Sequence, residues 1–315
     1  MSETLTPAMM TRKKPTFAQR MGAGWRRVPR PLRQGISLML LLLLLAIAWE
    51  GIKWIGGDPW RVSNNPFGLE HNPPFRFKAA SDLNLPHLWD IYEAFGNQSR
   101  RNGPTLISVL TAASWFTFRE AVVGFVLGSL LGFGLGILFA HSNLLERGLM
   151  PYVVASQTVP ILAIAPMVII WLKAGWVSVA IISAYLTFFP VTINTLRGLR
   201  SPDPMALDLM HAYAATKWTI LWKLRIPAAL PYIFTALKIS ATASVVGAII
   251  GELPSGIRDG LGGAILNFNS YYISAPSRLW ATILMTAVLG IVFYLLVTIV
   301  ETAVLRGRHR PADAQ

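Results

Sequence analysis

The sequence predicts an all-α polytopic membrane protein with about six transmembrane helices, and three observations support this. The 315 residues are 53% hydrophobic and only 14% charged, a combination that soluble domains rarely show. Six apolar segments approach the ~20 residues that cross a bilayer. Lysine and arginine gather beside these segments rather than in one basic surface. That clustering argues against nucleic acid as a partner and favours the lipid bilayer.

The apolar segments are expected at residues 36–55, 121–140, 151–172, 177–196, 230–250 and 279–304. The first carries the run LMLLLLLLAIAW, whereas the last four are broken by proline, glycine or single polar residues. Ala46-Ile47-Ala48 has the pattern of a signal-peptide cleavage site, but the basic region before it is too long and the apolar run continues to Ile55. We therefore expect an uncleaved anchor at 36–56.

Positive charge predicts the orientation of the chain. With the N-terminus inside, 17 of the 28 Lys and Arg residues are cytoplasmic, nine are external and two lie within spans, which favours both termini in the cytoplasm. The chain then comprises a basic segment (1–35), the anchor, a periplasmic loop (57–104), a transmembrane domain (105–305) and a tail (306–315). The loop has no clear period, so we expect an irregular structure that either caps the outer mouth or docks a partner.

The second span carries glycine at every fourth position, which lines one helix face with almost no side chain and allows another helix to approach closely. Its partner is either another span of this chain or a second subunit. The overlapping sequence GFGLG has the look of a nucleotide-binding loop, but no strand precedes it and its surroundings are apolar, so helix packing is the better interpretation. The packing residues are Gly124, Gly128, Gly132 and Gly136.

Motifs for catalysis are missing from the sequence. It has no cysteine, no GxxxxGK[ST] phosphate loop, no HExxH pair and no GxSxG elbow. Its five histidines are scattered outside the spans. We therefore expect no catalytic residue, no metal site and no cofactor bound by this chain itself.

Ionisable residues within apolar segments are costly and need an explanation. Glu50 and Lys53 are three residues apart, so pairing with one another is the simplest expectation. Lys238 is expected to line a cavity or to contact a neighbouring element. Glu252 lies in the sequence GELP, eight residues before Gly260-Leu261-Gly262, and either caps the backbone amides of that loop or serves the transport pathway.

Candidate pathway residues lie in the third and fifth spans. Gln157 and Thr158 precede Pro160, which interrupts a regular helix and frees backbone carbonyls. Ser240 and Ser244 supply hydroxyl groups early in the fifth span. The alternative for any such hydroxyl is a bond to its own helix. With Glu252, these residues form the candidate set for the pathway.

The polar stretch 201–231, between two apolar segments, is the most informative part of the chain. Pro202 and Pro204 mark its start, and Thr216 is a plausible N-cap for a second short helix. The stretch resembles the cytoplasmic coupling loop of bacterial ABC importer permeases, which has an acidic-small-small start, a glycine six residues after the acid and an apolar-proline close. The matching positions here are Asp208, Leu209, Met210, Ala214, Ile226 and Pro227.

Three other places carry the same resemblance: TFREAVVGF at 117–125, the phrase SQTVPILAIAPMVIIW, and the GEL…GLG segment. The third-span phrase is similar to that of nitrate/sulfonate/taurine-type permeases. The chain departs from the family pattern in having Asp208 for glutamate, Ala214 for glycine, and Glu120 where arginine is usual. Because alanine is strained at positive φ, we expect the corner at Ala214 to be built differently.

The resemblance implies the permease subunit of an ATP-driven, binding-protein-dependent importer in the bacterial inner membrane. Its partners would be a dimer of cytoplasmic ABC ATPases, which bind the ATP, and a second copy or a paired homologue of the permease. A periplasmic or lipid-anchored binding protein would deliver a small polar or anionic solute such as nitrate, a sulfonate or a vitamin precursor. The alternative is an ion-coupled secondary transporter, which would need an acid at mid-membrane.

Overall fold

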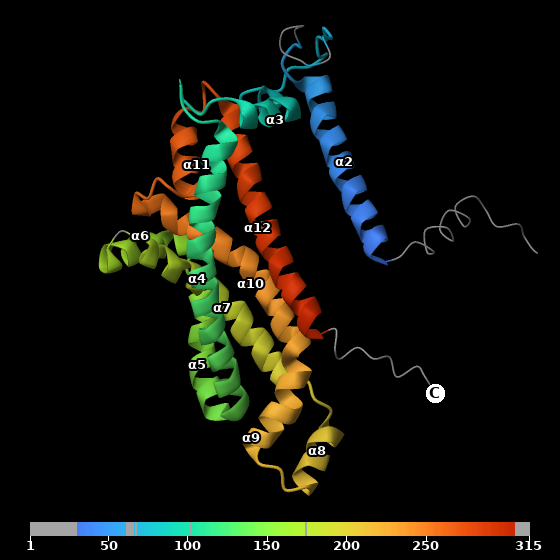
Figure 1. Cartoon of the computed structure of the whole chain (residues 1–315), viewed down its shortest axis with the longest axis vertical. Helices are drawn as coiled ribbons and strands as arrows, with labels where there is room; N and C mark the ends of the chain where they lie inside the picture. Colours follow the sequence, from blue (N-terminus) through green and yellow to red (C-terminus); the bar gives the residue numbers. More distant parts are fainter. Residues whose placement is uncertain (1–29, 61–65, 67, 101, 174, 306–315) are drawn as a thin grey trace, which may run out of the picture. The chain divides into compact units, whose positions relative to one another are not determined.

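The structure is a computed structural model that describes residues 30–60, 66, 68–100, 102–173 and 175–305. It consists of two units, Met1–Leu88 and Trp89–Gln315, each of which is described by itself. The predicted basic segment up to residue 29 and the predicted tail 306–315 lie outside the described residues. The helices, labelled as in Figure 1, confirm the all-α class.

The first unit is built on α2 (Arg30–Gly56), whose stretch Gly35–Gly56 is long and apolar enough to span a membrane. A short 3-10 helix, η2 (Lys78–Ala80), follows in the loop after α2. The side chains of Leu38 to Leu45 are exposed all round the helix, as expected for a span that faces lipid.

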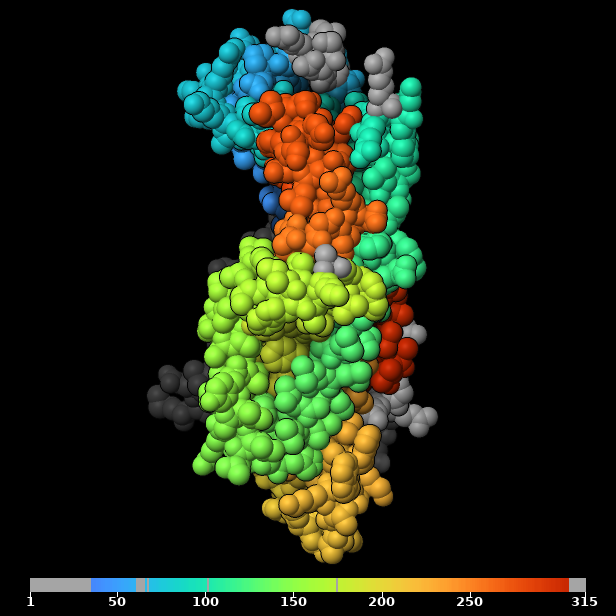
Figure 2. All heavy atoms as spheres, turned by 90° about the vertical axis from the view of Figure 1, so that its left-hand side faces the viewer, coloured from blue at the N-terminus to red at the C-terminus, as the bar shows by residue number. Residues whose placement is uncertain are grey.

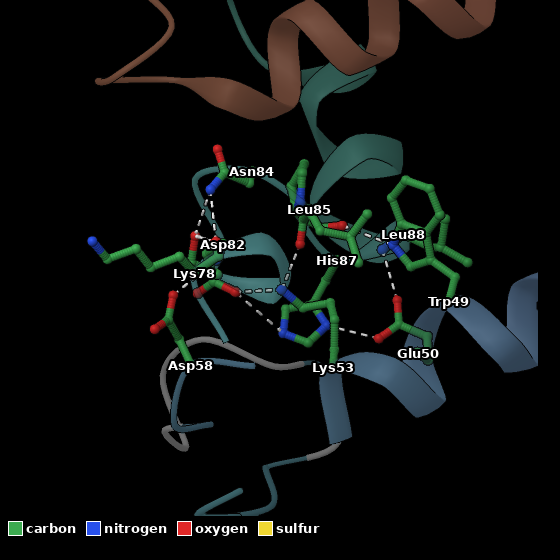
Figure 3. A network of polar contacts seen from close by, with 12 residues as sticks. Trp49, Glu50, Lys53, Asp58, Lys78, Asp82, Asn84, Leu85, His87 and Leu88 are labelled. Atoms are coloured by element: carbon green, nitrogen blue, oxygen red, sulfur yellow. Dashed lines mark hydrogen bonds and ion pairs between the residues drawn. The ribbon is translucent and has the colours of Figure 1, made fainter. Parts of the chain in front are cut away.

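Polar side chains near the end of α2 bind the loop rather than one another (Figure 3). The buried Lys53 ammonium donates to Asp82 Oδ1 at 2.5 Å and to the Leu85 carbonyl at 2.6 Å. Glu50 contacts His87 Nδ1 at 2.7 Å and accepts from the Leu88 amide at 2.8 Å. The predicted Glu50–Lys53 pairing is therefore wrong, because the returning loop offers both side chains closer partners.

Aromatic rings extend this attachment of the loop to α2. Trp54 stacks on His71 with ring centroids 3.7 Å apart. The ring of Trp60 makes T-shaped, edge-to-face contacts with both of these rings and with the ring of His87. The described residues of 57–104 form an irregular loop that includes short helices. Besides η2 they contain α3 (Leu88–Gly96), which begins at the last residue of the first unit.

The second unit is a bundle of four long helices, with α8, α9 and α11 towards its ends and α5 and α6 beside the long helices (Figure 1). The long helices are α4 (Leu106–His141), α7 (Trp176–Leu199), α10 (Ile226–Ser255) and α12 (Pro276–Leu305). The shorter ones are α5 (Asn143–Ser156), α6 (Ile161–Leu172), α8 (Pro204–Ala212), α9 (Lys217–Ile220) and α11 (Leu261–Ser270). A π-helical turn, η3 (Leu221–Arg225), joins α9 to α10.

The glycine face of α4 lies against α7. A Cβ atom built on Gly128 would stand 2.5 Å from the Ala184 carbonyl oxygen, and one on Gly132 would stand 2.5 Å from that of Phe188. Gly134, on another face, has open space around it. The partner of this face is therefore a span of the same chain, and the missing side chains let the two backbones approach closely.

The third predicted span, 151–172, is divided into two helices. α5 and α6 bend by 98° at residues 157–160, where Pro160 is the N-cap residue of α6. Five helices of the described residues are long and apolar enough to cross a membrane, and the α5–α6 pair makes a sixth if it counts as one broken span. α4 also starts well before residue 121, where the second span is predicted to begin. The prediction begins late because Arg119 and Glu120 lower the local hydropathy, although they do not end the helix.

Lys238 contacts a neighbouring element, one of the two alternatives for it. Its ammonium group lies 2.7 Å from Glu301 Oε2 on α12. Both side chains are largely buried, so the pair ties α10 to α12 at a depth where either charge alone would be costly.

Candidate functional site

The 201–231 stretch forms a helix, a corner and a second helix at one end of the second unit (Figure 1). Asp203 caps α8 by accepting from the Met205 amide at 2.9 Å, and Pro204 occupies the first turn, where its missing N–H costs nothing. Thr216 caps α9 by accepting from the Thr219 amide at 3.2 Å. These side-chain hydrogen bonds fix where each of the two short helices begins.

The corner between the helices is made by Ala214, which has a φ of +52°. The Ala215 amide donates back to the Met210 carbonyl at 3.0 Å, and the Ala214 amide donates to that of His211 at 2.9 Å. This is the left-handed helix ending that usually contains glycine. The expectation of a differently built corner is wrong, because the alanine itself adopts the strained conformation.

The outer surface of α8 and α9 is exposed and unusually apolar for a loop. Asp208 and Leu209 are exposed, Met210 is half-buried, and Ala214 and Thr216 are exposed at the corner. Around them, large apolar side chains are exposed on α8, on α9, at the corner and on η3, namely Met205, Leu209, Tyr213, Trp218 and Trp222. We call these five residues the loop surface. Such a patch at the end of a membrane bundle is typical of a protein–protein contact.

The base of the loop is fixed to the bundle by packing and by one ion pair. Leu221 of η3 is buried against Leu199 and Ala229, and the half-buried Ile226 packs on the same cluster beside Pro227. At the end of α7, the Arg200 guanidinium makes two hydrogen bonds to Glu146 of α5, one of them 2.8 Å long. Hydrogen bonding to that carboxylate raises the pKa of Arg200.

The pathway candidates do not form one cluster. Gln157, Thr158 and Pro160 are exposed at the bend between α5 and α6, where Thr158 donates to the Ala155 carbonyl at 2.8 Å. Ser240 and Ser244 are buried between α10 and α7. Ser240 donates to the Thr187 carbonyl at 3.3 Å, while Ser244 donates within its own helix at 2.8 Å.

Glu252 is completely buried where α10, α11 and α4 meet. Its Oε1 accepts from the Thr117 hydroxyl at 2.6 Å, and its Oε2 accepts from the Gly262 amide at 2.5 Å. Thr117 in turn accepts from the Leu261 amide at 2.8 Å. A Cβ on Gly262 would stand 2.7 Å from Glu252 Cβ, so this glycine makes room for the acid. This geometry corresponds to the capping alternative.

The sequence patterns did not single out Thr117 or Glu120 as site residues, yet both lie at this junction. They are three residues apart on α4 and therefore share a helix face. The available signal was an acid in the TFRE sequence inside an otherwise apolar helix. Its partner is 132 residues away in the chain, so spacing alone could not reveal the contact.

The opposite end of the second unit contains a half-open cavity of about 910 Å³. It lies between the first turns of α4 and the α10–α11 connection, drawn in teal and orange on the face seen in Figure 2. Its lining includes Ser108, Phe116, Arg258 and Asn267. Among the described residues, no three His, Asp or Glu side chains lie close enough to hold a metal ion.

The model of the family described as "Binding-protein-dependent transport system inner membrane component" matches residues 124–306, from the glycine face of α4 to the end of α12. The chain belongs to this family. It is a multi-pass permease component of an inner-membrane ABC transport system rather than an enzyme in its own right.

Several permeases of ABC transport systems are similar to the chain. It is 35% identical to the formylaminopyrimidine transport permease protein ThiX of Halalkalibacterium halodurans, over 49% of this chain and 63% of the relative. It is 31% identical to the riboflavin transport system permease protein RibX of Chloroflexus aurantiacus, over 60% and 70%. It is 32% identical to the putative aliphatic sulfonates transport permease protein SsuC of Bacillus subtilis, over 70% and 84%.

Proposed function

We propose that the loop surface on α8 and α9 docks a separate ATPase, which drives import through a pair of these permeases. The observation that carries the proposal is the exposed apolar helix–corner–helix, capped at both helix starts and anchored to α7 and α10 through Leu221. A rigid connection of this kind transmits movement of a bound partner into the spans.

The proposed assembly has a dimer of cytoplasmic ATPases, a second permease that is a copy or a paired homologue, and a periplasmic or lipid-anchored binding protein. The absence of a phosphate-loop motif in the sequence supports a motor on another chain. We propose a small polar or anionic solute as the cargo. Relatives named as transport proteins for nitrate, taurine, aliphatic sulfonates, riboflavin and formylaminopyrimidine support this class of solute.

We propose two groups of residues for the transport pathway. Gln157, Thr158 and Pro160 are exposed at the 98° bend, where a helix break places polar backbone and side chains at a surface. Ser240, Ser244 and Glu252 are enclosed within the bundle. For these three to meet solute, α10 would have to move relative to α7 and α4, which is the type of movement that the docked ATPase would supply.

Co-purification from native membranes tests the docking proposal. The variant Asp208→Arg, Ala214→Arg adds positive charge to the loop and should lose an ATPase that accompanies the wild type. The control Glu93→Arg, Tyr92→Arg makes the same charge changes on the exposed face of α3 and should retain it. If no ATPase accompanies the wild type even after crosslinking, or if uptake follows an ion gradient rather than ATP, the secondary-transporter alternative takes the place of this proposal.

A further inference from the structure

Glu120 has a feature that the proposed function leaves unexplained. Its side chain is 3% exposed, and Glu120 and Glu252 are the only acidic side chains that are buried among the described residues. As a carboxylate, Glu120 receives no hydrogen bond at either oxygen. A buried carboxylate without any donor is strongly unfavourable, so Glu120 needs a hydrogen-bond partner besides the contacts described above.

The nearest candidate partner is the carboxyl group of Glu252. Thr117, one turn before Glu120 on the same face of α4, already contacts Glu252 Oε1 at 2.6 Å. Two ionised carboxylates are both acceptors and repel one another. A proton on Glu120 would give this carboxyl group a donor for Glu252, and the repulsion would be replaced by a hydrogen bond.

The donors around the pair show which group keeps its charge. Glu252 accepts from the Thr117 hydroxyl and the Gly262 amide. Its carboxylate therefore lies at the N-terminus of α11, where the helix dipole favours an anion. Glu120 has no comparable donors. A single proton on Glu120 therefore satisfies both residues, leaving Glu252 as the anionic acceptor of three hydrogen bonds.

We propose that Glu120 and Glu252 form a binding site for one proton, shared between their carboxyl groups, and that this proton holds α4 against the α10–α11 junction. Removing the proton would leave two adjacent carboxylates and separate the helices. Among the described residues, no other charged side chain on the surrounding elements makes an ion pair with either acid. Lys238 of α10 is paired with Glu301 of α12, and the others on these elements and their ends are Arg119, His141, Lys173, Arg197, Arg258, Asp259 and Arg278.

Infrared spectroscopy of the full-length chain in lipid nanodiscs tests this site. At neutral pH the wild type should show the carbonyl stretch of a buried protonated carboxylic acid. Glu120→Gln should abolish this band, because the amide replaces the proton-bearing group and still donates to Glu252. The control Glu93→Gln, an exposed acid on α3, should retain the band. A wild-type spectrum without the band, or a band that survives in Glu120→Gln, would overturn the proposal.

Thermal unfolding provides a second readout that does not depend on detecting the band. From neutral to alkaline pH, the wild type should lose several degrees of melting temperature relative to Glu120→Gln, because only the wild type loses the bridging proton. Equal pH dependence of the two proteins would contradict the proposal. So would stabilisation of the wild type by sodium ions at neutral pH, which would identify a metal cation as the occupant instead.

Discussion

The two ends of the second unit use opposite chemistry. At the α8–α9 end, apolar side chains such as Trp218 and Tyr213 point outward and the corner at Ala214 is strained. At the α10–α11 end, polar groups such as Thr117 and Glu252 point inward and are bonded to one another. The first arrangement suits a contact that forms with a partner, and the second suits a joint that holds helices of one chain together.

This difference predicts that substitutions along α10 and its junction with α11 reduce the stability of the isolated chain, whereas substitutions on the loop surface leave stability intact and weaken association. The predictions below separate the two regions by measuring stability and partner retention on the same variants. They are arranged from the largest expected change in the free energy of unfolding to the smallest.

Lys238→Met should have the largest effect, about 3 kcal/mol, because it leaves Glu301 charged and without its partner inside the bundle. The measurement is reversible unfolding in mixed micelles. Adding Glu301→Gln to the same chain should restore most of the loss. A double variant as unstable as Lys238→Met alone would show that the ion pair is not the source of the effect.

Gly262→Ala should cost about 2 kcal/mol, because the new methyl group would collide with Glu252 Cβ and the Ile249 carbonyl oxygen. Gly134→Ala is the matched control, since a methyl group there meets open space and alanine favours a helix. Thermal unfolding of both variants checks the prediction. Equal melting temperatures would mean that the junction adapts more easily than its packing indicates.

Ala214→Gly should stabilise the chain by up to about 1 kcal/mol, because glycine adopts a φ of +52° without a Cβ penalty. Part of that gain is lost to the greater freedom of glycine in the unfolded chain. Unfolding measurements on the purified permease check the sign. A loss of stability would show that the alanine methyl group makes a contact that outweighs the backbone strain.

Trp218→Ser and Leu209→Ser should change the unfolding free energy by less than about 0.5 kcal/mol, because both side chains are exposed. Retention of the ATPase on the affinity-tagged permease should nevertheless fall severalfold in each variant. Tyr92→Ser, on α3, is a control at a still more exposed apolar side chain and should leave retention unchanged. Full retention of the ATPase in the two loop variants would show that the loop surface is not its docking site.

The sequence predicts the architecture well where one physical signal dominates. Apolar length locates the spans, and the capping pattern at Thr216 indicates the second short helix. The signal is weaker where opposing effects meet. The helix is interrupted at Pro160, between α5 and α6, although the surrounding residues are apolar. Glu120 in contrast lies within the continuous helix α4 although it is acidic. Hydropathy averages over a window and therefore places the start of the second span after Glu120, whereas the proline itself predicts the interruption at residue 160.

Long-range pairs are the part that the sequence could not supply. The partners of Lys53, Lys238 and Glu252 lie 29, 63 and 135 residues away, and nothing local identifies them. The conformation of Ala214 was misjudged for a different reason. The preference of alanine against positive φ is only about 1–2 kcal/mol, which the bonds to the Met210 and His211 carbonyls and the caps of α8 and α9 overcome.

Site-specific crosslinking tests the central claim most directly, and the absence of native cysteine makes the labelling of this chain specific. Leu209→Cys on the loop surface and Tyr92→Cys on α3 would each be labelled in native membranes with a maleimide that carries a short photoreactive group, which inserts into a nearby C–H or N–H bond of a partner on illumination. The account predicts that Leu209→Cys crosslinks to an ATPase subunit while Tyr92→Cys does not. No ATPase adduct at Leu209→Cys, in membranes where transport is active, would contradict it.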